Sequence, residues 1–232
     1  MMNNLSKILT AILIFFFTNN MPVYADFKKG IKAYQNKDYR AAHKEFLYSA
    51  NKGEEQGQYN LGLLYESGLG VPQDFREAAK WYREAAENGH AMAQYNLGYL
   101  YDIGKGLPQD YRAAAEWYLK SADQGDDMAQ FNMGIMYFEG LGVLQDFRES
   151  AKWNTKAAEQ GNTSAQLSLG GMYYIGQGVL QDYVTAHMWY NLASAYGNED
   201  GRRNRGIIEK KMSSDEISEA QSKARKWMEA HP

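Results

Sequence analysis

The sequence predicts an all-α fold, a solenoid of stacked helix-turn-helix units with a 36-residue period and a C-terminal capping helix. Three observations support this prediction. An aspartate returns every 36 residues, as Asp74, Asp110, Asp146 and Asp182. A tryptophan returns at the same interval, as Trp81, Trp117, Trp153 and Trp189, and so does a glycine pair that begins with Gly68 and Gly70. A fixed period of this length is typical of arrays in which each unit buries its apolar face only against its neighbours.

The segments of the chain follow this period. Residues 26–53 are expected to form a degenerate first unit with a shorter loop between its helices. Four full units follow, at residues 54–89, 90–125, 126–161 and 162–197. Residues 198–232 leave the period and are predicted to form a helical cap, whose last helix begins with the capping-box pair Ser213 and Glu216. A terminal helix with a polar face closes the exposed end of such an array.

Each full unit is predicted to contain a helix A and a helix B, which in the first unit cover about residues 55–67 and 75–88. Gly68 suits the left-handed residue that ends helix A. Asp74 is placed to cap helix B, and Glu77 would complete a variant of the capping box.

Gly62 lies inside the predicted helix A, where glycine costs about 1 kcal/mol relative to alanine. Its return in every full unit therefore indicates a packing role. We expect it to allow close approach of helix B through the small side chains of Ala78 and Ala85. The repeated tryptophans, beginning with Trp81, are expected to form the core between repeats rather than a sugar-binding platform.

Residues 1–25 are predicted to be a signal peptide that is cleaved after Ala25. Lys7 precedes the apolar run Ile8–Phe17, which is shorter than the roughly 20 residues that a membrane span needs. An uncleaved anchor is the alternative. The chain has no cysteine, which excludes lipid attachment and disulfides. We therefore predict a periplasmic or secreted protein without stable membrane insertion after cleavage.

Composition limits the classes of partner and of site. The hydrophobic fraction is 44% and the aromatic fraction is 14%, which is enough to build a core. The formal net charge is −3, and both signs are mixed along the chain without a basic stripe. This pattern argues against nucleic acid as a partner.

No residues combine into a predicted catalytic, cofactor-binding or metal site. Helix capping explains the repeated aspartates. The four histidines lack metal-ligand spacing, since His43 and His187 occupy the same repeat position in units at opposite ends of the array. The pair Gly68 and Gly70 lacks the following lysine and the preceding strand of a phosphate-binding loop.

The repeat pattern A-x-x-x-L-G-x-x-Y-x-x-G-x-G-V-x-x-D-x-x-x-A-x-x-W-Y-x-x-A-A-x-x-G is most complete in residues 93–125. It resembles the Sel-one-like repeat family, which is close to the tetratricopeptide repeat, and the resemblance covers about residues 38–197. The degenerate first unit is itself similar to a tetratricopeptide unit. The resemblance implies right-handed stacking of the helix pairs and a concave surface lined by A helices. It also implies an adaptor role in export, envelope regulation or host interaction.

Within the otherwise constant repeat, one set of helix A positions varies, and by analogy with tetratricopeptide stacks these positions face a ligand. The predicted partner-binding residues are Gln56, Tyr59, Leu63, Glu66, Met92, Tyr95, Tyr99, Asp102, Met128, Phe131, Ile135, Phe138 and Tyr174, with Leu167 and Gly171 completing the line. A strip rich in aromatic residues and methionine, with acidic points, suits capture of a peptide or helix. The alternative for Tyr59, Tyr95 and Phe131 is packing between repeats.

The sequence thus predicts an exported, monomeric repeat scaffold that binds proteins or peptides through its concave face, without a cofactor, as an adaptor or regulator in the bacterial envelope. One alternative is an envelope hydrolase acting on cell-wall peptides or β-lactams. It follows from an exported branch of the resembled family that has been linked to this activity, but that branch is disulfide-stapled and this chain has no cysteine. A second alternative is a secreted factor that engages host-cell proteins.

Overall fold

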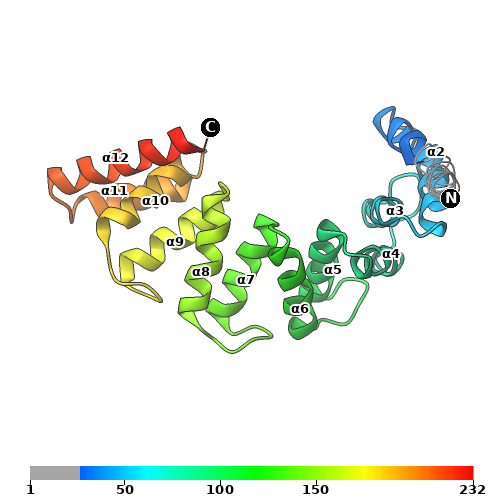
Figure 1. Cartoon of the computed structure of the whole chain (residues 1–232), viewed down its shortest axis with the longest axis horizontal. Helices are drawn as coiled ribbons and strands as arrows, with labels where there is room; N and C mark the ends of the chain where they lie inside the picture. The colour runs from blue at the N-terminus through cyan, green and yellow to red at the C-terminus, as the bar shows by residue number, and fades with distance from the viewer. Residues whose placement is uncertain (1–26, 232) are drawn as a thin grey trace, which may run out of the picture. The chain divides into compact units, whose positions relative to one another are not determined.

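The computed structural model describes residues 27–231, and every regular element in this range is a helix (Figure 1). Residues 27–35 are helical, and α2 (Tyr39–Asn51) follows them. The repeat helices are α3 (Glu55–Ser67), α4 (Phe75–Glu87), α5 (Ala91–Ile103), α6 (Tyr111–Asp123), α7 (Asp127–Glu139), α8 (Phe147–Glu159), α9 (Thr163–Ile175) and α10 (Tyr183–Ala195). Two further helices, α11 (Glu199–Glu209) and α12 (Ser214–Ala230), complete the chain. The predicted all-α fold of stacked helix pairs is confirmed, whereas the expected signal peptide lies outside the described residues.

The described residues fall into two compact units that divide between Gln109 and Asp110. The first unit holds residues 27–35 and α2 to α5, and the second holds α6 to α12. None of the described helices is both long enough and apolar enough to cross a membrane.

The loop inside each helix pair is held by its glycines and by hydrogen bonds. Gly68 ends α3 in the left-handed conformation, with φ of 68°, as predicted. The side chain of Gln73 donates to the backbone carbonyl of Glu66 at 2.8 Å. Gly70, with φ of 75°, lies so close to the preceding pair that a Cβ atom there would collide with the backbone carbonyl of Tyr39. Each loop therefore rests directly on the backbone at the start of the preceding helix B.

The repeated aspartates cap the B helices, as predicted. Asp74 accepts hydrogen bonds from the backbone N–H groups of Arg76 at 2.8 Å and Glu77 at 3.2 Å. The second half of the predicted capping box does not form. The backbone N–H of Asp74 already donates to the carbonyl of Tyr65 at 2.9 Å, so Glu77 lies beside Lys80 instead, at 3.7 Å.

The interior glycine faces helix B, but the group that it accommodates differs from our expectation. A Cβ atom at Gly62 would lie 2.6 Å from ring carbons of Tyr82, which is fully buried. Gly170 lies in the same way against the ring of Tyr190, also at 2.6 Å. The expectation that Ala78 and Ala85 define the close approach is wrong, because the atoms nearest to the glycine belong to the ring of Tyr82.

The four repeated tryptophans differ in how far they are buried. Trp153 and Trp189 are buried, as predicted, whereas Trp81 and Trp117 are only partly buried. Trp117 carries the ammonium group of Lys120 over its ring at 3.8 Å. The prediction of a tryptophan core therefore holds for the last two repeats, and in the first two the following tyrosine is the fully buried ring.

The helices beyond the repeats cover α10. Ile208 of α11 is fully buried against it. Trp227 of α12 meets Trp189 edge to face, with ring centroids 6.4 Å apart. The predicted capping box at the start of α12 is formed, since Ser213 and Glu216 each bind the other's backbone. The expected helical cap is therefore present, and it consists of two helices.

Candidate functional site

The predicted binding residues contribute to two hollows, one in each compact unit. The first hollow has a volume of about 550 Å³. It is lined by the predicted residues Tyr59, Leu63, Glu66 and Tyr99, together with Ser67, Gln73, Phe75, Asn96, Ile103 and Lys105. Four residues predicted for the same surface do not line it, namely Gln56, Met92, Tyr95 and Asp102.

The contacts of the first hollow separate packed groups from accessible ones. The hydroxyl group of Tyr82 donates to the carboxylate of Glu66. Burial raises the pKa of Tyr82, so the phenol stays protonated and remains a donor. Tyr59 stacks on the ring of His90, with centroids 4.5 Å apart. Tyr99 is 40% exposed and is the most accessible aromatic side chain of this hollow.

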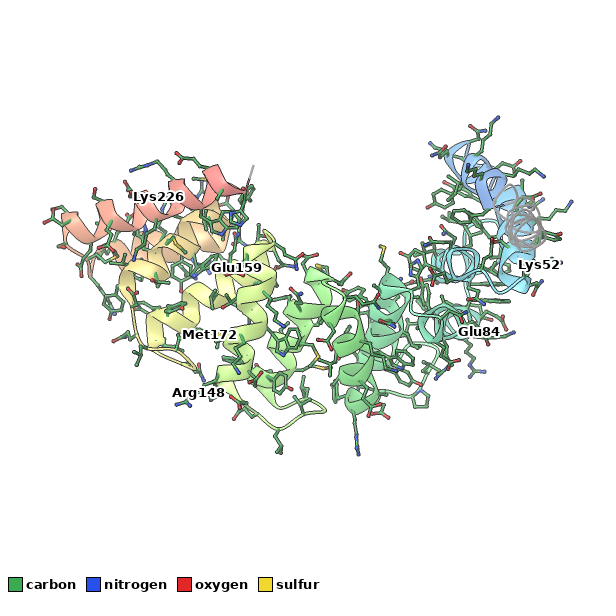
Figure 2. All side chains as sticks on the ribbon, viewed as in Figure 1. Lys52, Glu84, Arg148, Glu159, Met172 and Lys226 are labelled. Carbon is green, nitrogen blue, oxygen red and sulfur yellow. The ribbon has the colours of Figure 1, made fainter. Side chains whose placement is uncertain are left out.

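The second hollow lies among α7, α8 and α9 and has a volume of about 410 Å³. It brings together the predicted residues Phe131, Ile135, Phe138, Gly171 and Tyr174. The buried side chain of Met172, labelled in Figure 2, also lines it. Of the other predicted residues in this unit, Met128 is exposed outside the hollow, and Leu167 packs beside the core cluster that includes Tyr190.

The buried polar lining of the second hollow comes from two α8 residues that sequence reasoning missed, Ser150 and Asn154. Both are buried, with exposed fractions of 0% and 3%. Asn154 stands in the repeat position that Tyr82 holds in α4, and Ser150 stands where α4 has Ala78. The available signal was this departure from the residues that the other repeats share.

Hydrogen bonds hold these two side chains in one arrangement. The hydroxyl group of Ser150 donates to the backbone carbonyl of Gly134 at 2.7 Å. The amide nitrogen of Asn154 donates to the backbone carbonyl of Ser150 at 2.9 Å. The amide oxygen of Asn154, Oδ1, is buried and has no hydrogen-bond partner within the described residues. An unpaired buried acceptor is costly, so this atom offers an incoming donor a favourable interaction.

The aromatic walls of the second hollow are braced from behind. Phe138 meets Phe147 edge to face at 5.3 Å, and Tyr174 stacks on Tyr183 at 5.7 Å. The ammonium group of Lys211 donates to the hydroxyl of Tyr174 at 2.7 Å. Rings held in this way present an apolar surface whose shape is set before a ligand arrives.

Titratable groups do not gather at either hollow in a way that suits metal binding. Within residues 27–231, no cluster of three or more histidine, aspartate or glutamate side chains is placed to hold an ion. His43 lies 3.3 Å from the hydroxyl of Tyr65, and His187 lies 2.9 Å from the carboxylate of Glu209. Each of these histidines is thus engaged with a neighbour outside the hollows.

The four helix pairs from α3 to α10 coincide with matches to a family model. The Sel1 repeat model matches residues 56–90, 91–126, 127–162 and 163–198. The chain is a Sel1 repeat protein. Among curated proteins, no relative matches this Sel1 repeat protein.

Two solved structures are similar along most of the chain. A Sel1 repeat protein from Oxalobacter formigenes is 30% identical, with a TM-score of 0.76, and the match covers 86% of this chain and 84% of that one. A second is c5321, a protective antigen of uropathogenic Escherichia coli strains that displays the same repeat fold. It is 28% identical, with a TM-score of 0.51, and the match covers 89% of this chain and 61% of that one. The present chain thus aligns with less than two thirds of c5321.

Proposed function

We propose that this Sel1 repeat protein is a scaffold without enzymatic activity that binds peptide or helical segments of partner proteins through its A helices. We further propose that it is exported and acts as an adaptor or regulator in the bacterial envelope. The observation that carries the proposal is that constant and variable residues have different places within each repeat. Glycines, aspartates and helix B rings build the frame, while many of the helix A residues that vary, though not all, line the two hollows.

The solvent exposure of two variable residues supports a role in binding. Tyr99 in the first hollow and Ile135 in the second are 40% and 39% exposed, although both are large and apolar. Apolar side chains that line an open hollow together are typical of sites where a partner's side chains are buried. The proposal therefore assigns these two residues direct contact with the partner.

Site-specific photocrosslinking tests this assignment. A photoreactive phenylalanine analogue replaces Tyr99, Ile135 or Leu119 in the tagged full chain, expressed in its native host. Leu119 is the matched control, because it is 38% exposed but lies on helix B α6, outside both hollows. We expect defined protein adducts from positions 99 and 135 and none from position 119. Adducts of equal yield at all three positions would contradict the proposal.

Two simpler measurements test the remaining parts. Purified protein is expected to leave a chromogenic β-lactam intact, and turnover that a substitution in either hollow abolishes would favour the hydrolase.

Cell fractionation distinguishes the periplasm from the culture medium.

A further inference from the structure

The second hollow exists because one aromatic ring is missing from the repeat frame. Tyr82 covers Gly62 and Tyr190 covers Gly170, each with ring carbons 2.6 Å from the point where a Cβ atom on the glycine would lie, and both tyrosines are buried. In the repeat between residues 126 and 161, Asn154 faces Gly134 instead, with its amide nitrogen 2.5 Å from the corresponding point. The shorter side chain covers the glycine but leaves the space beyond it empty.

The partner of the missing hydroxyl group is also absent. Tyr82 donates its hydroxyl to Glu66 on the same helix pair. The residue that corresponds to Glu66 in the third repeat is Phe138, an apolar wall of the second hollow. Among the buried side-chain nitrogen and oxygen atoms of the described lining of this hollow, only Asn154 Oδ1 has no hydrogen-bond partner. An aromatic ring that enters from the A-helix side would therefore meet its hydrogen-bond acceptor at Asn154.

The orientation of the Asn154 amide follows from its neighbours. Its nitrogen lies 2.9 Å from the carbonyl of Ser150, which can only accept. Turning the amide over would place two oxygen atoms against each other, so the oxygen is the atom left unpaired. A ligand group at this point must therefore be a donor, and an apolar group would leave the acceptor unsatisfied.

We propose that the second hollow anchors a tyrosine side chain of a peptide ligand, with its ring between the walls formed by Phe131, Phe138 and Tyr174 and its hydroxyl donating to Asn154 Oδ1. This inference rests on the proposed function for the peptide nature of the ligand. Aromatic rings in such walls gain affinity beyond their buried area. The hydroxyl distinguishes tyrosine from phenylalanine, because the acceptor is otherwise left without a partner.

The test uses the full chain with labelled isoleucine methyl groups and two capped tripeptides, acetyl-Gly-Tyr-Gly-amide and acetyl-Gly-Phe-Gly-amide, observed by NMR titration. Ile135 and Ile175 line the second hollow. Ile103 and Ile208 lie outside it, so their methyl signals serve as internal controls. We expect the tyrosine peptide to shift the signals of Ile135 and Ile175 saturably and the phenylalanine peptide to bind about tenfold more weakly. Equal affinity of the two peptides, or no saturable shift at Ile135 and Ile175, would overturn the inference.

Two variants and one control assign the effect to Asn154. Asn154→Tyr places a ring in the hollow, where other repeats have a tyrosine. It should abolish the shifts while preserving the melting temperature. Asn154→Leu removes the acceptor and should equalise the two peptides; it decides the question if the tyrosine variant does not fold. Leu119→Ala, on α6 in the same compact unit but outside the hollow, should leave both affinities unchanged. Unchanged discrimination in Asn154→Leu would contradict the inference.

The outcomes also separate this inference from the proposed function. If photocrosslinks form at positions 99 and 135 but the tyrosine peptide does not bind, the scaffold proposal stands and the tyrosine anchor is wrong. If p-cresol shifts Ile135 and Ile175 but the tyrosine peptide does not, the hollow accepts a free phenol, and the peptide anchor is wrong.

Discussion

The helix pairs α3–α4 and α7–α8 have the same frame and differ at the residue that covers the interior glycine. In the first pair Tyr82 fills the space and ties its hydroxyl to Glu66. In the other pair Asn154 leaves a hollow of about 410 Å³ and an unpaired acceptor. One repeat can thus exchange packing for a hollow without a change in helix lengths, in the cap of helix B or in loop length.

The exchange of a packed ring for a hollow is expected to affect the free energy of unfolding. A buried ring that contacts its surroundings closely contributes several kcal/mol, and a hollow forgoes part of that contribution. The first pair is therefore expected to depend strongly on its covering residue, and the other pair only weakly. Substitutions at matched positions of the two pairs test this difference.

The largest effect is expected from removing the covering side chains. Tyr82→Ala should lower the free energy of unfolding by about 3–5 kcal/mol, because it empties a fully buried site and leaves Glu66 without its donor. Asn154→Ala should cost only about 1–2 kcal/mol, since it removes mainly a hydrogen bond beside an existing hollow. Urea denaturation followed by circular dichroism measures both. Equal losses would show that the two covering residues carry the same packing.

The next contrast concerns the glycines themselves. Gly62→Ala forces a methyl group against a buried ring and should cost about 1–3 kcal/mol. Gly134→Ala meets the end of the Asn154 side chain, which gives up its hydrogen bond to Ser150 when it moves toward the hollow. The gain in helix propensity, about 1 kcal/mol, should offset most of that cost. Melting temperatures of the two variants test this order. A Gly134 variant as unstable as the Gly62 variant would contradict it.

The caps should show no contrast. Asp74→Ala and Asp146→Ala each remove the same pair of hydrogen bonds to the first turn of a B helix. We expect each variant to lose about 1 kcal/mol of stability. Chemical denaturation of both variants side by side is the measurement. A markedly smaller loss for Asp146 would mean that the pair with the hollow has a looser frame.

The smallest effect concerns the start of helix A. Asp126 caps α7, whereas Glu54 provides no side-chain cap for α3. Burial raises the pKa of Asp126 above its unfolded value, so the ionised form opposes folding at neutral pH. Asp126→Asn keeps an acceptor, as Asn162 does at the start of α9, and should raise stability at pH 7 by less than about 0.5 kcal/mol.

The sign of this effect depends on pH. The gain is present above the raised folded pKa and fades as the pH falls below the unfolded pKa of about 3.9, where Asp126 is protonated in both states. Thermal unfolding at pH 7 and at pH 3 measures the difference. A gain at pH 3 equal to that at pH 7 would assign the effect to something other than charge.

The period, the helix ends and the caps could be predicted from the sequence because each follows from local rules. A glycine that ends a helix and an aspartate that begins one act within a few residues of themselves. The partner of Gly62 could not be predicted in this way. It depends on how helix B is rotated, and both alanines and a tyrosine were available on that helix.

The second hollow was predicted only in part. Phe131, Ile135, Phe138 and Tyr174 were expected on the binding surface, because they vary among otherwise constant positions. Asn154 was not predicted, because the B helices of the other full units have tyrosine at this position and the repeat pattern alone assigns it to the core, although the departure from tyrosine is visible in the sequence. Whether these residues bind a partner stays a prediction.

The contact between Gly70 and the backbone carbonyl of Tyr39 has a consequence for how such chains change length. Gly142 and Gly178 make the same contact with the carbonyls of Tyr111 and Phe147. A glycine on a peptide group recognises no particular side chain, so this joint between neighbouring helix pairs does not depend on their sequences. A copy of the repeat inserted by gene duplication would keep this contact whatever side chains flank it, so this part of the joint sets no condition on sequence when the number of copies changes.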